Sequence, residues 1–409
     1  MRAQETGLPE DFEAVAPWRP YGGLPTPELS LVPQGHAPSG KNALKISFAE
    51  STQAPFVGRP LRGTDAWDKA AGIAFSVKGD GGDGARFVCV TLIDESFGRR
   101  YSALVSLAGK DWREVRLRWG DFVPESTAVE WPAPTKNGPE PAFKPSAIRA
   151  LWAGRPFYLK PWNAASFQLA HVHLEEKIEP REEAPPENGG VARTLAKLRA
   201  KEPVTIVCLG DSITAGEGLK DRERQAFAAR LETLLRERFG YDKITVLNRG
   251  VNGLETRQGL ILLPRELGEP APDLVIAHFG YNDFTAMSER KLAPEAARAA
   301  AAGNFLQLIQ RVRILSAGKT EVLLVATAPG ALESRHTSMA FFGEEARKAA
   351  QELRAGFCDG PRKAFADALA AGKLDGYFAK PSGGLDFAHP NEAGHEVFAR
   401  GLLESFPKE

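Results

Sequence analysis

The sequence predicts two domains: an N-terminal all-β jelly-roll sandwich, and a C-terminal α/β domain with a parallel sheet between helices. Residues 12–176 consist of short alternating segments separated by Gly, Pro and Asp turns. Residues 201–409 alternate apolar runs with long helical patterns, which is typical of parallel strands joined by helices. Between them, residues 177–200 combine a charged, Pro- and Gly-rich linker with a short helical pattern. A chain of 409 residues is long enough to give both domains a full core.

The first half contains seven segments with strand-like alternation or apolar character. They are residues 43–48, 72–77, 86–92, 101–107, 112–119, 147–152 and 166–174. All 7 tryptophans of the chain also lie in this half. An indole ring can stack on the apolar face of a sugar or pack into a core, and the sequence leaves both interpretations open. Trp131 and Trp162, in Pro-rich contexts, are predicted to be exposed and are therefore the candidate sugar contacts here.

Three patterns of the first half carry a family resemblance: residues 75–81 (Phe-Ser-Val-Lys-Gly-Asp-Gly), 112–115 (Trp-Arg-Glu-Val) and 120–122 (Gly-Asp-Phe). They resemble the jelly rolls of carbohydrate-binding modules, over residues 12–176. The resemblance implies a structural calcium held by an early acidic residue, here Glu13, and by an aspartate in the last strand. The last strand has no aspartate at 168–171, so no calcium is predicted.

The second half reads as an open parallel sheet with helices on both faces. Strands are predicted at 204–209, 244–247, 273–279 and 321–326, and helices at 225–239, 254–267, 294–315, 344–371 and 391–404. In such sheets ligands bind at the carboxyl ends of the strands. Ser212 follows the first strand in the turn Gly210-Asp211-Ser212, where a helix N-terminus would face its hydroxyl group.

Three further clusters follow later strands or precede the last helix. Residues 248–253 and 280–283 come after the second and third strands, and either one alone would be an ordinary turn. Asp386-Phe387-Ala388-His389 places a carboxylate where it can reach back to Nδ1 of the histidine. An isolated pair of this kind is more often a structural cap, so the prediction depends on all four clusters together.

In this order, the four clusters resemble the SGNH (GDSL) hydrolase superfamily, over residues 203–406. The resemblance implies a three-layer, flavodoxin-like fold and ester hydrolysis through an acyl-enzyme. It assigns Ser212 as nucleophile, His389 as general base and Asp386 as the acid that orients the base. It also assigns an oxyanion hole to the backbone N–H groups of Ser212 and Gly253 and the side chain of Asn282.

The combination of a jelly roll with such a hydrolase resembles two-domain carbohydrate esterases, and implies an O-acetylesterase acting on an acetylated polysaccharide or oligosaccharide. Arg335 and His336 follow the fourth strand and are further candidate sugar contacts. Three alternatives stay open: a glycan O-acetyltransferase using the same residues, a lipase or thioesterase of the same superfamily, and a sugar-binding protein with a vestigial hydrolase half.

The charge and composition of the chain indicate which classes of binding partner are not expected. Lys+Arg and Asp+Glu both count 52, so the net charge is zero and neither nucleic acid nor an anionic membrane is an expected partner. No apolar stretch is long enough to cross a membrane, and no metal-ligand spacing or phosphate loop is present, so no cofactor or metal is predicted. The start of the sequence has no signal peptide. The sequence leaves oligomeric state open, and location too: cytoplasmic, or secreted or periplasmic if the chain is a trimmed form.

Overall fold

A computed structural model describes residues 8, 12, 14–15, 17–33, 42–81, 86–94, 99–125, 143–185, 188–268, 270–380 and 384–408. These residues form two compact units, one extending to Pro180 and one beginning at Arg181. The division falls within the stretch 177–200 that the sequence marks as a linker. Each unit is described separately below.

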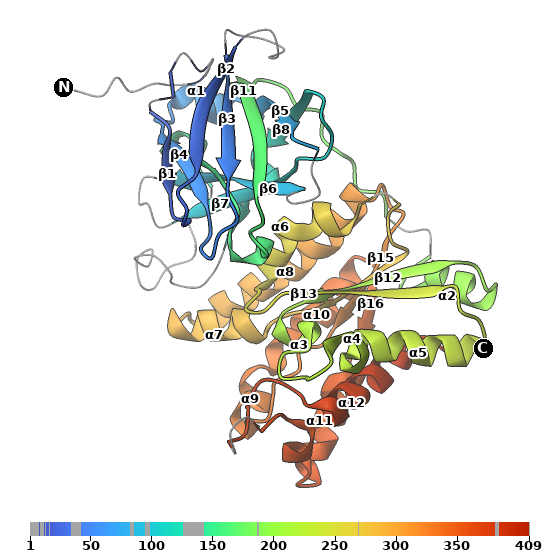
Figure 1. The fold of residues 1–409 in the computed structure, drawn as a ribbon. Helices are drawn as coiled ribbons and strands as arrows, with labels where there is room; N and C mark the ends of the chain where they lie inside the picture. The colour runs from blue at the N-terminus through green and yellow to red at the C-terminus, as the bar shows by residue number, and fades with distance from the viewer. Residues whose placement is uncertain are drawn as a thin grey trace. The chain divides into compact units, whose positions relative to one another are not determined.

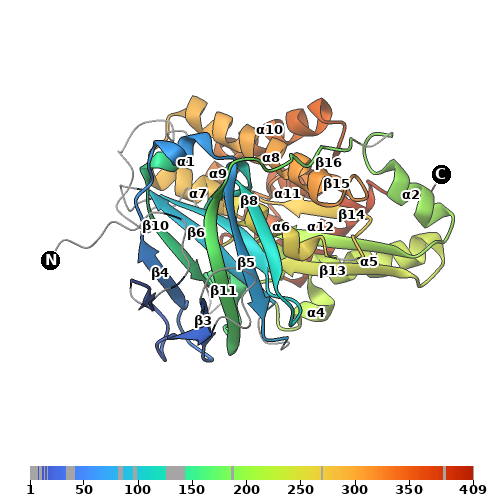
Figure 2. The same cartoon turned by 90° about the horizontal axis from the view of Figure 1, so that it is seen from above.

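The N-terminal unit consists of two antiparallel sheets, which confirms the all-β prediction. One sheet has the order β1 (Arg19–Tyr21), β4 (Phe56–Pro60), β10 (Ile148–Gly154), β6 (Phe87–Asp94), β7 (Arg100–Ser106) and β9 (Val123–Pro124). The other has the order β2 (Glu28–Pro33), β3 (Asn42–Phe48), β11 (Ala165–Glu175), β5 (Gly72–Gly79) and β8 (Arg113–Arg118). Figure 2 shows β11, β5 and β8 side by side. The four strands β1, β2, β4 and β9 were not predicted.

Strand alternation builds the core of this unit. On β6, Val88, Val90 and Leu92 join the core cluster, which also takes in Trp18 and Trp67. Each large apolar side chain buried in this way contributes about 1.5–3 kcal/mol relative to exposure. Short elements complete the unit: α1 (Asp65–Lys69), η2 (Trp119–Asp121), η3 (Pro145–Ala147) and η4 (Phe157–Leu159).

The predicted exposure of Trp162 is wrong. Its side chain is buried, with 8% of the residue exposed. The loop folds back on itself, so that the indole N–H donates to the carbonyl of Pro156 (3.3 Å) and the Lys160 ammonium lies 4.7 Å from the ring centroid. A proline-rich loop therefore buries this ring against its own backbone. Trp131 and Glu13 lie outside the described residues.

The C-terminal unit contains five parallel strands in the order β13 (Ile244–Gly250), β12 (Val204–Gly210), β14 (Leu274–His278), β15 (Glu321–Val325) and β16 (Gly356–Cys358). In chain order this is 2-1-3-4-5, the flavodoxin-like arrangement, so the predicted fold class is confirmed. The strand order reverses beside β12. Ligands of such sheets bind at this reversal, outside the carboxyl ends of the strands.

Helices cover both faces of the sheet (Figure 1). On one face, α5 (Phe227–Phe239), α11 (Gly360–Ala370) and α12 (Glu392–Leu403) pack against Ile206 and Cys208. On the other, α6 (Thr256–Glu266), α8 (Pro294–Leu315) and α10 (Ala340–Glu352) pack together. The shorter elements are α2 (Ala192–Arg199), α3 (Ser212–Ala215), α4 (Arg222–Gln225), α7 (Tyr281–Glu289), α9 (Glu333–Ser338) and η5 (Leu374–Tyr377). Among the described helices, none is long and apolar enough to cross a bilayer.

The helix predicted at residues 344–371 is interrupted in the structure. The pattern at 344–371 is two helices, α10 and α11, with the edge strand β16 between them. Arg354 adopts a left-handed conformation (φ 53°), which ends the first helix, and Phe357 then pairs with Leu324 of β15. Sheet pairing at this point overrides a helical pattern rich in alanine, because the strand completes the parallel ladder.

Candidate active site

Ser212 is the first residue of α3 and follows the end of β12 at Gly210. Asp211 forms the N-cap: its Oδ1 accepts the backbone N–H of Ile213 (2.9 Å). Asp211 is fully buried, and burial raises its pKa to about 7 against the opposing effect of that hydrogen bond. Asp211 therefore has a structural role, as the cap of the helix that begins with Ser212. Ser212 itself is half-buried.

The structure brings Ser212, His389 and Asp386 into one hydrogen-bonded series. Nε2 of His389 lies 2.9 Å from Oγ of Ser212, and its Nδ1 lies 2.7 Å from Oδ2 of Asp386. The other oxygen of Asp386 accepts the backbone N–H groups of Ala388 (2.8 Å) and His389 (3.0 Å). Burial alone would raise the pKa of Asp386, but these hydrogen bonds outweigh it and lower the pKa. The carboxylate is therefore ionised and oriented toward the imidazole.

The loop 251–255, called here the oxyanion loop, follows β13 and is tied to the strand that carries Ser212. The N–H of Val251 donates to the carbonyl of Gly210 (3.0 Å), and the loop turns through Gly253, whose φ of 78° favours glycine. Nδ2 of Asn282 donates to the carbonyl of Leu254 (3.1 Å), which leaves its second N–H available. Within the described chain, the backbone N–H groups of Ser212 and Gly253 have no acceptor.

A buried carboxylate holds the far end of the oxyanion loop. Asp283, next to Asn282 on α7, accepts the backbone N–H of Thr256 at the start of α6 with both oxygens (3.2 and 3.1 Å). Burial, with the negative charge of Glu255 added to it, raises the pKa of Asp283 to about 7. This hydrogen bond between Asp283 and Thr256 holds the predicted cluster at residues 280–283 next to the loop that contains the end of the cluster at residues 248–253.

Arg335 and His336 lie on α9, where Arg335 packs on α7 and His336 contacts the segment 330–331, which is hydrogen-bonded to the loop of the predicted base. The Arg335 guanidinium lies 4.4 Å from the ring centroid of Tyr281, the residue before Asn282. Nε2 of His336 lies 3.0 Å from the carbonyl of Gly330, and burial lowers the pKa of His336. The neighbouring N–H of Ala331 donates to the carbonyl of Phe387 (2.8 Å). Contact of Arg335 and His336 with sugar stays a prediction.

Phe387 and Glu217 lie close to the predicted site residues, and neither was predicted from the sequence to belong to the site. Phe387, between Asp386 and His389, is 48% exposed. Glu217 accepts hydrogen bonds from the side chains of Asn252 and Arg222. Its only sequence signal is its position between Gly216 and Gly218, directly after the serine turn.

This arrangement can perform acyl transfer. An imidazole whose tautomer is set by a carboxylate can take the proton of the serine hydroxyl, and unpaired N–H groups can receive the developing oxyanion. The described residues bring together no group of three His, Cys, Asp or Glu side chains that could hold a metal ion.

Residues 208–397 match the family model of the GDSL-like lipase/acylhydrolase family. This part of the chain is similar to GDSL-like lipases and acylhydrolases. Together with the geometry, the match supports carboxylic ester hydrolysis by this domain. The assignment of individual roles to Ser212, His389, Asp386, Gly253 and Asn282 stays a prediction.

Solved structures similar to the chain include an acetylxylan esterase from Geobacillus stearothermophilus, 20% identical, covering 50% of this chain and 95% of that chain with a TM-score of 0.39. They also include an alpha/beta hydrolase enzyme from the metagenome of Lake Arreo, Spain, 23% identical with the same coverage and a TM-score of 0.39. None of the curated proteins compared with the chain matches it.

Proposed function

We propose that the chain is a serine esterase that removes acetyl groups from a carbohydrate, a carbohydrate O-acetylesterase. The observation that carries the ester chemistry is the hydrogen-bonded series Ser212–His389–Asp386, which lies at the carboxyl edge of the parallel sheet. It joins a nucleophile, a base and an orienting acid in the geometry that acyl transfer requires.

In the proposed reaction, Oγ of Ser212 attacks the acetyl carbonyl carbon while its proton passes to Nε2 of His389. The N–H groups of Ser212, Gly253 and Asn282 stabilise the oxyanion. The bond from carbon to the sugar oxygen then breaks, and the departing alcohol takes the proton from His389. Water, deprotonated by the same imidazole, attacks the acetyl-serine, releases acetate and restores the hydroxyl group.

The surface of the domain favours a short acyl group. Of its described residues, Phe387 is the one large apolar side chain that is substantially exposed. A long acyl chain binds by burying apolar surface, at about 0.8 kcal/mol per methylene, and this needs a larger apolar patch. Polar Glu217, Asn252 and Arg222 stand at the oxyanion loop instead.

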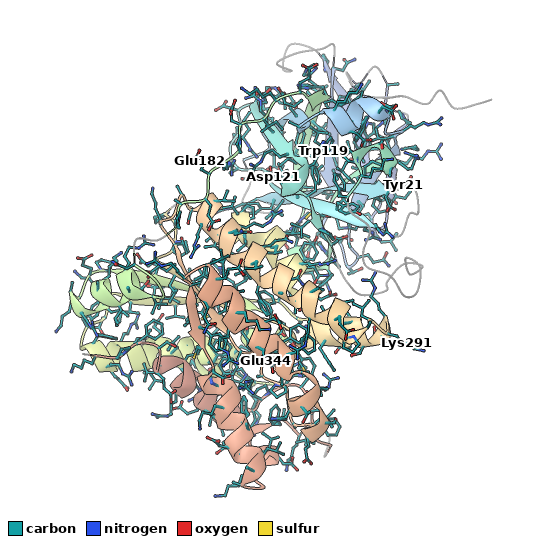
Figure 3. The ribbon with its side chains drawn as sticks, turned by 180° about the vertical axis from the view of Figure 1, so that it is seen from behind. Tyr21, Trp119, Asp121, Glu182, Lys291 and Glu344 are labelled. Carbon is teal, nitrogen blue, oxygen red and sulfur yellow. The ribbon has the colours of Figure 1, made fainter. Side chains whose placement is uncertain are left out.

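The N-terminal unit supports a carbohydrate as the alcohol. Tyr21 is 38% exposed (Figure 3), and its ring stacks on that of Trp152 at 4.9 Å and 14°. The indole of Trp152 packs against Gly58, where a Cβ atom would come within 2.2 Å of the ring. The glycine thus provides the space for an aromatic surface on this sheet, and such surfaces bind the apolar faces of sugar rings.

The proposal is tested by acetate release from acetylated xylan and by hydrolysis of p-nitrophenyl esters of increasing chain length. We expect activity that is highest for acetyl and is abolished in Ser212→Ala. An acyl optimum well beyond acetyl would contradict the acetylesterase, and activity retained in Ser212→Ala would contradict the mechanism. Acetylated glycan appearing in place of free acetate, when an acceptor glycan is added, would indicate transfer.

A second variant tests whether the aromatic surface of the N-terminal unit binds the carbohydrate. Tyr21→Ala is expected to weaken retention of the protein on the polysaccharide and to leave p-nitrophenyl acetate kinetics unchanged. Equal retention of the two proteins would contradict the role of this aromatic surface.

A further inference from the structure

Glu217 is held against the nucleophile by its own backbone. It follows α3 between Gly216 (φ 79°) and Gly218 (φ 84°), and its N–H donates to the carbonyl of Ser212 (2.9 Å). The two left-handed glycines turn the chain sharply at this point. Any displacement of Glu217 therefore acts directly on the residue that carries the nucleophile.

The carboxylate of Glu217 reaches the oxyanion loop. Its Oε2 accepts Nδ2 of Asn252 (2.5 Å) and Nη2 of Arg222 (2.5 Å). Asn252 immediately precedes Gly253, whose N–H is one of the predicted oxyanion donors. The hydrogen bond from Asn252 lowers the pKa of Glu217, and the positive charge of Arg222 acts in the same direction. Glu217 is therefore a carboxylate at neutral pH.

The same turn lies beside the predicted base. A Cβ atom on Gly218 would come within 3.8 Å of the Cβ of His389. The turn that carries Glu217 therefore adjoins both the residue of the predicted nucleophile, through the Ser212 carbonyl, and the predicted base, through Gly218.

We propose that Glu217 is a positioning residue for the ester hydrolysis, which sets the oxyanion loop through its hydrogen bond with Asn252. The inference rests on the proposed function, because it assigns a role within the same site. Glu217 acts on the transition state, in which the oxyanion is formed, and not on the binding of substrate.

Two substitutions remove the contact with Asn252 in steps. Glu217→Gln keeps an oxygen acceptor for Asn252 and removes the charge, whereas Glu217→Ala removes both. With p-nitrophenyl acetate we expect kcat to fall about 3–10-fold in the first and about 10–100-fold in the second, with KM within about twofold.

Two comparisons control for indirect effects. Glu344→Gln removes a half-buried carboxylate of α10 (Figure 3) that pairs with Arg298 at 2.8 Å, and it is expected to leave kcat unchanged. Asn252→Ala should reduce kcat, and adding Glu217→Ala to it should reduce kcat further by less than the single Glu217→Ala does, because the two residues act partly as one unit. Losses that simply multiply would overturn the role through Asn252.

Two outcomes would overturn the proposal: a kcat of Glu217→Ala within about twofold of the wild type, or a KM that rises in Glu217→Ala while kcat is unchanged. If Glu217→Ala does not fold, Glu217→Gln and Asn252→Ala carry the same test. Failure of the proposed function is recognised separately, as absence of esterase activity in the wild type. In that case the rate at which diisopropyl fluorophosphate labels Ser212, compared between the wild type and Glu217→Gln, decides the inference.

Discussion

Nε2 of His389 lies 2.9 Å from Oγ of Ser212, although 177 residues separate them in the chain. The serine is placed by the first strand of the sheet and the histidine by the turn before the last helix, and both reach the carboxyl edge of the sheet. The contact is a consequence of the parallel topology, since every strand ends at that edge. The orientation of the imidazole, by contrast, is a local property of residues 386–389.

Replacing the orienting carboxylate tests that local property. Asp386→Ala is expected to reduce kcat by about 10²–10⁴-fold with a small change in KM, because His389 loses the partner that sets its tautomer and stabilises the imidazolium. Steady-state kinetics with p-nitrophenyl acetate measure the effect, and thermal unfolding confirms that the variant is folded. A loss smaller than about tenfold would remove Asp386 from the triad.

Asn282→Ala tests the oxyanion hole. The variant removes a side-chain donor beside the oxyanion loop, and the expected loss is about 10²–10³-fold in kcat, or about 3–4 kcal/mol of transition-state stabilisation. KM should change little, since the ground-state carbonyl carries less charge. A large rise in KM at constant kcat would show that the side chain binds substrate and does not act on the oxyanion.

The raised pKa of Asp211 leads us to predict how the free energy of unfolding depends on pH. An unfolded aspartate loses its proton near pH 3.8, whereas burial raises the pKa of Asp211 in the folded protein to about 7. Between these values the folded state binds more protons, so this group lowers the free energy of unfolding as the pH rises, by up to about 1.4 kcal/mol per pH unit. Asp211→Asn retains the acceptor for the Ile213 N–H and cannot ionise.

Chemical denaturation at pH 5 and pH 8 measures this effect. The decline in the free energy of unfolding between the two conditions should be smaller in Asp211→Asn than in the wild type. An equal decline in both proteins would show that Asp211 does not keep its proton in the folded state. Asp283, with a pKa also raised to about 7 by burial, should give a second case of the same sign in Asp283→Asn.

Substitution of Phe387 tests whether the sugar of the substrate binds beside the predicted base. Its ring is exposed beside the predicted base, so Phe387→Ala should cost little stability, below about 1 kcal/mol. We expect KM for an acetylated xylo-oligosaccharide to rise several-fold while kcat for p-nitrophenyl acetate stays within about twofold. Phe387→Trp should restore the KM. Unchanged KM for the oligosaccharide in Phe387→Ala would place the sugar elsewhere.

The sequence predicted what depends on short-range pattern. All seven predicted strands of the first half are present, because alternation reports directly which face of a strand is buried. The terminal helix, predicted from residue 391, begins after Asn391, whose Oδ1 accepts the N–H of Gly394 (3.0 Å). The pair Asp386 and His389 was equally predictable, since the four residues 386–389 of one turn determine it.

Burial and long-range pairing were not predictable in the same way. A proline-rich context suggested that Trp162 is exposed, yet its exposure depends on whether the loop folds back over the ring. The strand β16 was hidden in a helical pattern, because three residues with a partner strand can outweigh an alanine-rich propensity. Glu217 gave almost no signal, since an isolated glutamate in a turn is usually solvated.

The sequence alone therefore determined the class of both domains and the order of the four clusters, and it gave Ser212 as the predicted nucleophile, because periodicity and turn chemistry are local. Only the tertiary structure decided which groups meet: the carboxylate of Glu217 with Asn252, Asp283 with the start of α6, and the ring of Tyr21 with Trp152. Such contacts join segments distant in the chain, and strand order and loop closure set their geometry.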